Sequence, residues 1–134
     1  VIYTKDIKKF KKMNFKNVKN YIFKDKIPEA ISKIKIILVL NSLCTDAFYW
    51  SDRVHIMIGS GAFCITEYVE GIDKTYKDNE HHVILKDVSK IIDKIQFWIN
   101  KDLDRKKISV CGYNYSHKVH SYNSRVKEFI NYIE

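Results

Sequence analysis

The stretch "WSDRVHIMIGSGAFCIT", residues 50–66, places a helix directly before an apolar strand. Three apolar side chains recur at helical spacing on one face: Val54, Met57 and Ile58. Gly59 and Gly61, two of only four glycines in the chain, stand at the junction. Glycine lets a chain leave a helix and turn back at once. This stretch therefore predicts one helix–strand step of an α/β sheet.

Short apolar segments alternate with helical periodicity on both sides of this stretch. The expected strands are residues 1–3, 21–23, 36–40, 62–66 and 82–85. A helix is expected at 27–34, and the last fifty residues are expected to be helical. The uninterrupted apolar run at 36–40, "IILVL", is typical of a strand covered on both faces. This alternation predicts an α/β fold with a mostly parallel sheet covered by helices.

Three apolar stripes predict the packing of the C-terminal helices. They are Val88, Ile91, Ile92, Ile95, Trp98 and Ile99; Ile108, Cys111, Gly112, Tyr115 and Val119; and Val126, Phe129, Ile130 and Ile133. Asp87 is expected to cap the first of these helices. Gly112 inside the second costs about 1 kcal/mol relative to alanine, which predicts a close packing contact there.

Length and composition favour one folded domain over residues 1–134. The chain is 46% apolar, and it has no apolar run near the ~20 residues that span a bilayer. Cys44, Cys64 and Cys111 are widely spaced without a CxxC pair, so we expect no metal site. Cys64 and Cys111 are expected to be small core residues. An odd cysteine count without a disulfide framework predicts a cytoplasmic protein.

The net charge of +8 is concentrated at the N-terminus. Residues 1–36 hold 11 lysines against Asp6, Asp25 and Glu29, whereas residues 37–134 are neutral. Such a basic third could face an anion, an acidic partner or nucleic acid, or it could be a solvated face in a chain rich in Lys, Ile, Asn and Tyr. No aromatic stacking platform accompanies the charge. We therefore do not expect nucleic acid as a partner, and a peripheral association through the basic third stays an alternative.

The carboxyl ends of the expected strands predict the binding site, because ligands bind there in open parallel sheets. Residues 41–53 and 66–72 leave two such ends. Ser51 can cap the helix by accepting a backbone N–H of its first turn. Free N–H groups, the helix dipole and the forked guanidinium of Arg53 would suit a phosphate. The alternative is an ordinary helix start, with Arg53 paired to Asp52 or Asp46.

The histidines and Trp50 are weaker candidates. His55 is expected to serve packing or the surface. His81 and His82 are adjacent, and consecutive strand residues face opposite sides, so they are expected to be structural and not metal ligands. Trp50 could stack on a base or pack in the core.

Ordered motifs over residues 36–134 carry a family resemblance. They are "LVLN" ending at Asn41, "YWSDRV", "IGSGAFCITEYVEGI", "HHVILKDVSKIIDKIQFWI" and a closing segment with His120, Ser121, Tyr122 and Arg125. In this order they resemble the C-terminal half of a GT-B glycosyltransferase, in the group 1, spore-maturation-like branch. The resemblance is looser over residues 1–35.

The resemblance implies a Rossmann-like three-layer α/β/α domain that binds a nucleotide-diphosphate sugar as donor substrate, with no resident cofactor or metal. It implies that 1–134 is the C-terminal part of a longer chain, whose N-terminal GT-B domain supplies the acceptor site. The implied donor and phosphate contacts are Asn41, Ser51, Asp52, Arg53, Glu67, Tyr68 and Gly71. His120 and Arg125 are expected to fix the closing helix. No catalytic residue or acceptor is assigned.

Two departures from the pattern keep a second hypothesis open. Many relatives carry glutamates that contact the ribose and the donor sugar, where this chain has Ile56 and Phe48. A carboxylate such as Asp52 or Glu67 would have to replace the ribose contact. The alternative function is a non-catalytic binding module, either a degenerate transferase half or a basic domain that docks on nucleic acid or an acidic partner.

Overall fold

The computed structural model describes residues 2–4, 6–14, 16, 18–20, 26–31, 33–41 and 46–133. The chain divides into two compact units, residues 1–33 and 34–134. The strand expected at 21–23 and Cys44 lie outside the described residues.

The first unit contains two parallel strands and two short helices. Its elements are β1 (Ile2–Thr4), α1 (Ile7–Lys12), β2 (Val18–Asn20) and α2 (Ile27–Ile31). Ile2 lies opposite Val18 in the β1–β2 pair. Asp6 caps α1 by accepting the N–H of Lys9 at 3.2 Å. The strand expected at 1–3 and the helix expected at 27–34 are thus present, and the helix ends early, at Ile31.

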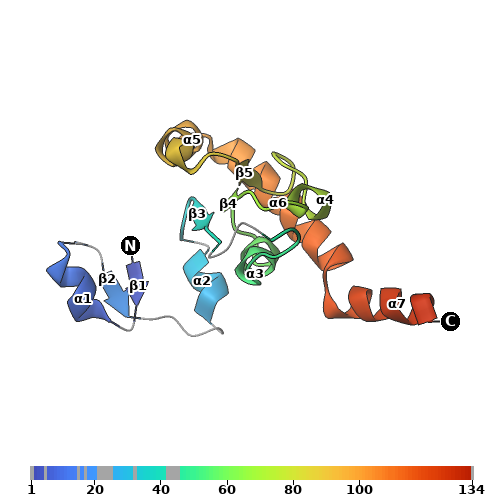
Figure 1. Cartoon of the computed structure of the whole chain (residues 1–134). Coiled ribbons are helices and arrows are strands. Elements are labelled where there is room, and N and C mark those ends of the chain that lie inside the picture. The colour runs from blue at the N-terminus through green and yellow to red at the C-terminus, as the bar shows by residue number, and fades with distance from the viewer. Residues whose placement is uncertain are drawn as a thin grey trace. The chain divides into compact units, whose positions relative to one another are not determined.

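The second unit is a three-stranded parallel sheet with helices (Figure 1). Its strands are β3 (Ile37–Val39), β4 (Cys64–Glu67) and β5 (Val83–Leu85), in the order β3-β4-β5. Its helices are α3 (Arg53–Gly59), α4 (Ile72–Thr75), α5 (Ile91–Ile99), α6 (Asp102–Val119) and α7 (Tyr122–Ile133), with a 3₁₀ turn, η2, at Val88–Lys90. The expected α/β fold with a parallel sheet is confirmed, and its arrangement is Rossmann-like.

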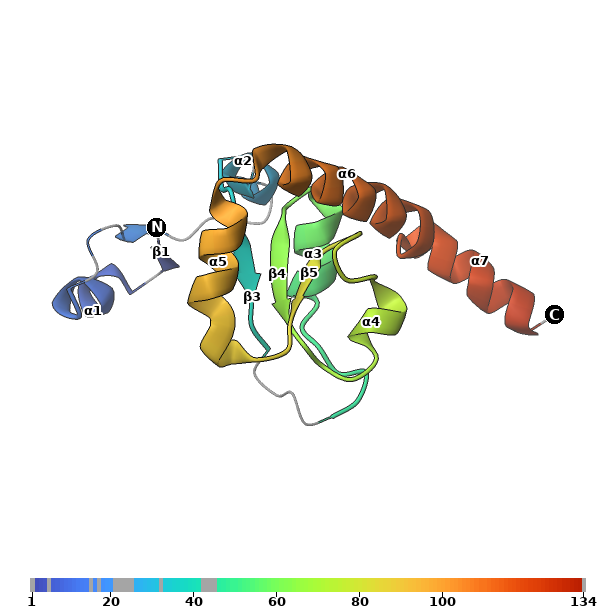
Figure 2. The same ribbon diagram turned by 90° about the horizontal axis from the view of Figure 1, so that it is seen from above.

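The helices form layers on both sides of this sheet. Figure 1 shows α5 and α3 on opposite faces, and Figure 2 shows α6 running past the amino ends of the strands. The main core cluster lies between the sheet, α5 and α6; its buried members are Phe63, Ile65, Val83, Leu85, Trp98 and Ile108. Val54 and Ile58 of α3 are fully buried, as their spacing predicted, while Met57 is half-buried.

Two backbone features explain two of the three glycines singled out in the sequence. Gly59 is the last residue of α3 and has no positive φ, so the turn out of the helix does not depend on it. Gly61 has φ +79°, the left-handed region that favours glycine, and the N–H of Ala62 closes the helix end by donating to the carbonyl of Met57 at 3.1 Å. Gly112 of α6 is buried, and a Cβ there would overlap the carbonyl oxygen of His81. The expected close contact at Gly112 is therefore confirmed.

Burial differs from the sequence prediction at β3. Leu38 and Leu40 are 39% and 43% exposed, whereas Val39 is buried. Consecutive side chains of a strand point to opposite faces, so the face of β3 that carries Leu38 is not covered by the described residues, and the prediction of a strand covered on both faces is wrong.

The C-terminal stripes are also covered less than expected. Asp87 does cap η2, by accepting the N–H of Ser89 at 2.9 Å, and Trp98 and Ile108 are buried. Cys111, expected in the core, is exposed. Val88 and Ile92 are exposed as well, as is the whole α7 stripe: Val126, Phe129, Ile130 and Ile133. Apolar residues at helical spacing show that a helix has an apolar face. They do not show that another element covers this face.

No helix among the described residues is both long and apolar enough to cross a membrane.

Candidate functional site at the carboxyl edge of the sheet

Asn41 joins the ends of β3 and β4 to the start of α3. Its backbone N–H donates to Glu67 Oε2 at 3.0 Å, and its Nδ2 donates to the Glu67 carbonyl at 3.3 Å. Its Oδ1 accepts the N–H of Ser51 at 3.1 Å. Asn41, Glu67 and Ser51 are all half-buried. Three of the residues implied by the resemblance are thus brought together in one hydrogen-bonded cluster.

Arg53 is held at this cluster through Ser51. Ser51 Oγ accepts the Arg53 backbone N–H at 3.3 Å, the bond to the first turn that was expected, and it accepts Arg53 Nε at 3.0 Å. The N-cap position of α3 is nevertheless Asp52, whose side chain makes no capping hydrogen bond, so Ser51 lies one residue before the cap. Arg53 is exposed, and within the described part of the chain its terminal guanidinium nitrogens carry no ion pair. Asp52 is also exposed and accepts from Ser51 Oγ at 3.4 Å. The ion pair between Arg53 and Asp52 or Asp46, weighed as the alternative, is therefore not formed.

The backbone of α3 offers less to an anion than the sequence suggested. The Arg53 N–H is used by Ser51 Oγ, and the Val54 N–H donates to the Ser51 carbonyl at 3.0 Å. The expectation of free N–H groups is therefore wrong for these two residues. Because α3 has only seven residues, its aligned peptide dipoles are also few. A cationic contact at the start of α3 therefore depends on the Arg53 guanidinium and not on the backbone N–H groups of Arg53 and Val54.

Tyr68 and Gly71 lie in the turn that leaves β4. The Tyr68 N–H donates to the Leu85 carbonyl at 2.9 Å, and Lys86 Nζ lies 5.7 Å from its ring centroid. Gly71 is buried with φ +92°, and the ring of Phe48 occupies the space that a Cβ would need. Tyr68 is half-buried and keeps some surface for a ligand, whereas the buried Gly71 serves the turn.

Phe48 and Ile56 occupy exposed positions near this edge. Phe48 is 59% exposed, has φ +61°, and donates its N–H to the Glu70 carbonyl at 2.8 Å. This bond runs beside the turn that leaves β4. Ile56 is 40% exposed. Neither side chain can accept a hydrogen bond from a hydroxyl, so the carboxylates that remain close to Arg53 and Asn41 are Asp52 and Glu67.

Behind the cluster runs a chain of hydrogen-bonded rings that the sequence did not reveal. Trp50 Nε1 donates to His55 Nε2 at 3.1 Å, so His55 carries its proton on Nδ1 and donates it to Tyr76 Oη at 3.0 Å. The Tyr76 hydroxyl donates to Ser116 Oγ at 3.3 Å. Burial lowers the pKa of His55, and Arg125 lowers it further. His55 therefore serves packing, as expected, and is neutral at pH 7. Trp50 is half-buried and held by His55, and its stacking on a base stays a prediction.

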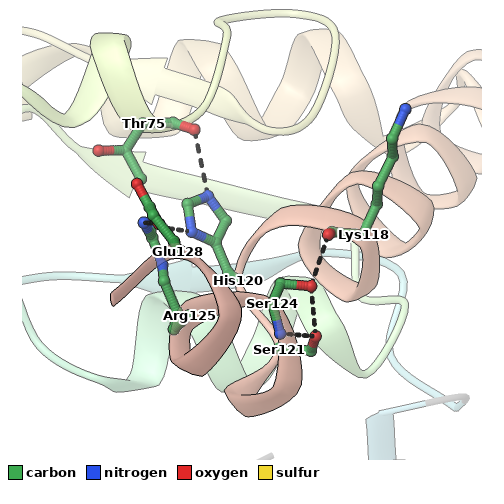
Figure 3. A network of polar contacts seen from close by, with 7 residues as sticks. All are labelled: Thr75, Lys118, His120, Ser121, Ser124, Arg125 and Glu128. Atoms are coloured by element: carbon green, nitrogen blue, oxygen red, sulfur yellow. Dashed lines mark hydrogen bonds and ion pairs between the residues drawn. The ribbon is translucent and has the colours of Figure 1, made fainter. Parts of the chain in front are cut away.

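His120 and Arg125 fix the start of α7 (Figure 3). An Arg125 guanidinium nitrogen donates to His120 Nδ1 at 2.6 Å, and His120 Nε2 donates to the Thr75 carbonyl at 3.5 Å. Ser121 Oγ accepts the Ser124 N–H at 3.3 Å, and Ser124 Oγ donates to the Lys118 carbonyl at 2.8 Å. Tyr122, the fourth residue of the closing segment, is 92% exposed. These contacts agree with the structural role expected of His120 and Arg125.

Replacing Arg125 by alanine should raise the pKa of both His120 and His55. Burial is the first cause of the low pKa of each ring, and the positive charge of Arg125 is the second. The alanine variant removes the charge and the hydrogen bond to His120 Nδ1 but leaves the burial by other elements, so both pKa values should move part of the way back towards the ordinary value. Histidine titration followed by NMR measures this. Lys127→Ala, an exposed change on the same helix, should leave both values where they are; equal shifts in the two variants would contradict the assignment.

The other two candidate histidines are structural. His82 is fully buried; its Nδ1 accepts from Thr66 Oγ1 at 3.1 Å, and its Nε2 donates to the Tyr76 carbonyl at 3.3 Å. His81 is buried and accepts the Lys77 N–H on Nδ1 at 3.2 Å. Among the described residues no group of three or more His, Cys, Asp or Glu side chains is arranged to hold a metal ion.

Fold and site together define a class. A parallel Rossmann-like sheet whose polar residues meet at the carboxyl edge is the arrangement that open α/β proteins use for ligands. A family described as "Glycosyl transferase-like" matches residues 6–131, and the chain belongs to this family. No curated protein matches the chain.

Proposed function

We propose that this chain is the nucleotide-sugar-binding, C-terminal half of a GT-B glycosyltransferase of the spore-maturation-like branch. It binds a nucleotide-diphosphate sugar, and an N-terminal domain of the same protein brings the acceptor. The observation that carries the proposal is the Asn41–Glu67–Ser51 cluster, which holds the exposed Arg53 at the carboxyl edge of the sheet. Membership in the glycosyl transferase-like family supports it.

In this function Arg53 contacts the diphosphate. Its Nε is anchored to Ser51 Oγ, which leaves the two terminal nitrogens to donate to phosphate oxygens. During transfer an acceptor oxygen bonds to the anomeric carbon, the bond from that carbon to the diphosphate oxygen breaks, and the electron pair stays on the diphosphate. The acceptor proton passes to solvent or to a basic side chain. A fixed cation stabilises the negative charge that grows on the leaving group.

Glu67 and Asp52 are the carboxylates placed to accept hydroxyl groups of the donor. Glu67 Oε2 is used by Asn41, so its Oε1 is the oxygen left for a ligand within the described part of the chain. Asp52 is exposed beside Arg53. These two residues replace the carboxylates absent at Phe48 and Ile56, and Tyr68 borders the same turn.

Arg53→Ala should weaken nucleotide-diphosphate binding by about tenfold to a hundredfold, because a hydrogen bond to a charged group contributes about 1.5–3 kcal/mol. A thermal-shift screen against UDP, GDP, ADP, TDP and CDP and their sugars finds the ligand, since binding to the native state raises the melting temperature. Titration of the hit then measures the loss. Arg53→Lys keeps the positive charge but not the forked guanidinium, so its nucleotide affinity should lie between those of the parent chain and Arg53→Ala. Lys106→Ala, at an exposed position of α6, should bind the nucleotide like the parent chain. If Arg53→Ala binds the nucleotide as tightly as the parent chain, the assignment of Arg53 as a diphosphate contact is wrong.

A non-catalytic binding module is the second candidate function. The exposed apolar side chains of Phe48 and Ile56 favour it, because they cannot bind the sugar or ribose hydroxyls. This candidate predicts that the protein binds a nucleotide sugar but neither transfers the sugar nor hydrolyses the donor, even slowly. Turnover of a donor by the protein would contradict this candidate.

We place the protein in the cytoplasm, where the thiols of Cys64 and Cys111, both free in the structure, stay reduced. Burial raises the pKa of the Cys64 thiol to about 12, which keeps it inert.

A further inference from the structure

The unit formed by residues 1–33 carries most of the excess positive charge. It contains ten lysines and no arginine, against Asp6, Asp25 and Glu29. The described lysines in and directly after α1 are exposed: Lys8, Lys9, Lys11, Lys12 and Lys16. Lys26, which directly precedes α2, is exposed as well. The two described carboxylates of this unit are engaged, since Asp6 caps α1 and Glu29 pairs with Lys33 at 2.7 Å. Among the described ion pairs none contains Lys8, Lys9, Lys11, Lys12 or Lys16, whereas Lys26 interacts with the Glu29 carboxylate.

The order of residues in α1 separates charge from apolar groups. In "IKKFKKM", residues 7–13, Ile7, Phe10 and Met13 recur every third position. At about 100° per residue these three fall on one side of a helix, and the four lysines fall on the other. Met13, directly after α1, is 59% exposed although it is apolar.

We propose that α1 and its lysines dock the protein on an anionic lipid surface. Lysines near such a surface are attracted to its headgroups, and an apolar side chain among them can enter the acyl boundary. Nucleic acid fits less well, because its specific contacts favour the forked guanidinium, and all three arginines lie outside residues 1–33. The exposed Met13 likewise suits lipid better than phosphates and sugars. This proposal is independent of what the carboxyl edge of the sheet binds.

The test is sedimentation of the full chain with vesicles of phosphatidylcholine alone or with one third phosphatidylglycerol. Binding should require the anionic lipid and should weaken as salt shortens the Debye length. The variant with Lys8, Lys9, Lys11 and Lys12 all changed to Gln should bind at least about 100-fold more weakly, since each lysine near an anionic surface contributes about fivefold. Met13→Asn should reduce the affinity for anionic vesicles by a smaller factor than the quadruple lysine variant, and this factor should not depend on the salt concentration. Circular dichroism checks that each variant is folded.

The matched control removes four positive charges from the other unit, residues 34–134. Lys90, Lys106, Lys118 and Lys127 are exposed lysines of the other unit, and changing all four to Gln should leave vesicle binding within about threefold. Equal losses in both quadruple variants would overturn the proposal in favour of attraction by net charge alone. Absence of binding at low salt, equal binding to neutral vesicles, or binding to RNA or DNA without binding to anionic vesicles would each overturn it as well.

Discussion

Gly112→Ala should lower the free energy of unfolding by about 3 kcal/mol, near the upper end of the cost of overpacking a core. At an ordinary helix position the same change stabilises by about 1 kcal/mol, so the sign is the informative part. Here the new Cβ would overlap the carbonyl oxygen of His81 and lie 3.0 Å from Ile58 Cγ2. The first obstacle is backbone, which cannot rotate away as a side chain can.

Urea unfolding followed by circular dichroism measures this change. Asn114→Ala on the exposed side of α6 is the control, and it should stabilise slightly, because alanine has the higher helix propensity. A Gly112→Ala variant as stable as the parent would show that α6 does not pack against the start of β5 in solution.

Acid should destabilise the second unit between about pH 6.5 and pH 4, chiefly through His82. Burial lowers the pKa of this ring to about 4, whereas in the unfolded chain it is near 6.5. The unfolded state therefore binds the proton first as the pH falls, and stability is full above about pH 6.5 and lost on the way to pH 4. A difference of this size corresponds to about 3 kcal/mol. The pKa values of His55, His81 and His120 are also lowered by burial, so they act in the same direction.

His82→Gln tests the assignment, since glutamine does not titrate. The free energy of unfolding of this variant should depend much less on pH between 6.5 and 4, whereas Asn114→Ala, which removes no titrating group, should keep the parent dependence. If His82→Gln does not fold, NMR titration of His82 in the parent chain measures its pKa directly and tests the same assignment. A His82 pKa near 6.5 would contradict the prediction.

The candidate site was predictable where it follows from topology. Strands that run parallel bring their carboxyl ends to one edge, so Asn41, Ser51 and Glu67 could be expected together before their hydrogen bonds were known. The Arg53 guanidinium could be expected there too, because it stands two residues after Ser51. The chain from Trp50 through His55 to Tyr76 was not predictable, since Tyr76 follows His55 by 21 residues and no sequence pattern couples them.

The amino-acid sequence by itself determined the α/β class, the three strands of the second unit with its helices except the short α4, the cap at Asp87 and the need for a side-chain-free position at 112. These depend on local periodicity and on the conformations of single residues, which neighbours in the chain decide. Only the tertiary structure decided that Leu38, Cys111 and the apolar face of α7 are exposed, and that buried His82 is neutral. Burial and the pKa shifts that follow from it depend on segments far apart in the sequence, and periodicity along one segment carries no information about them.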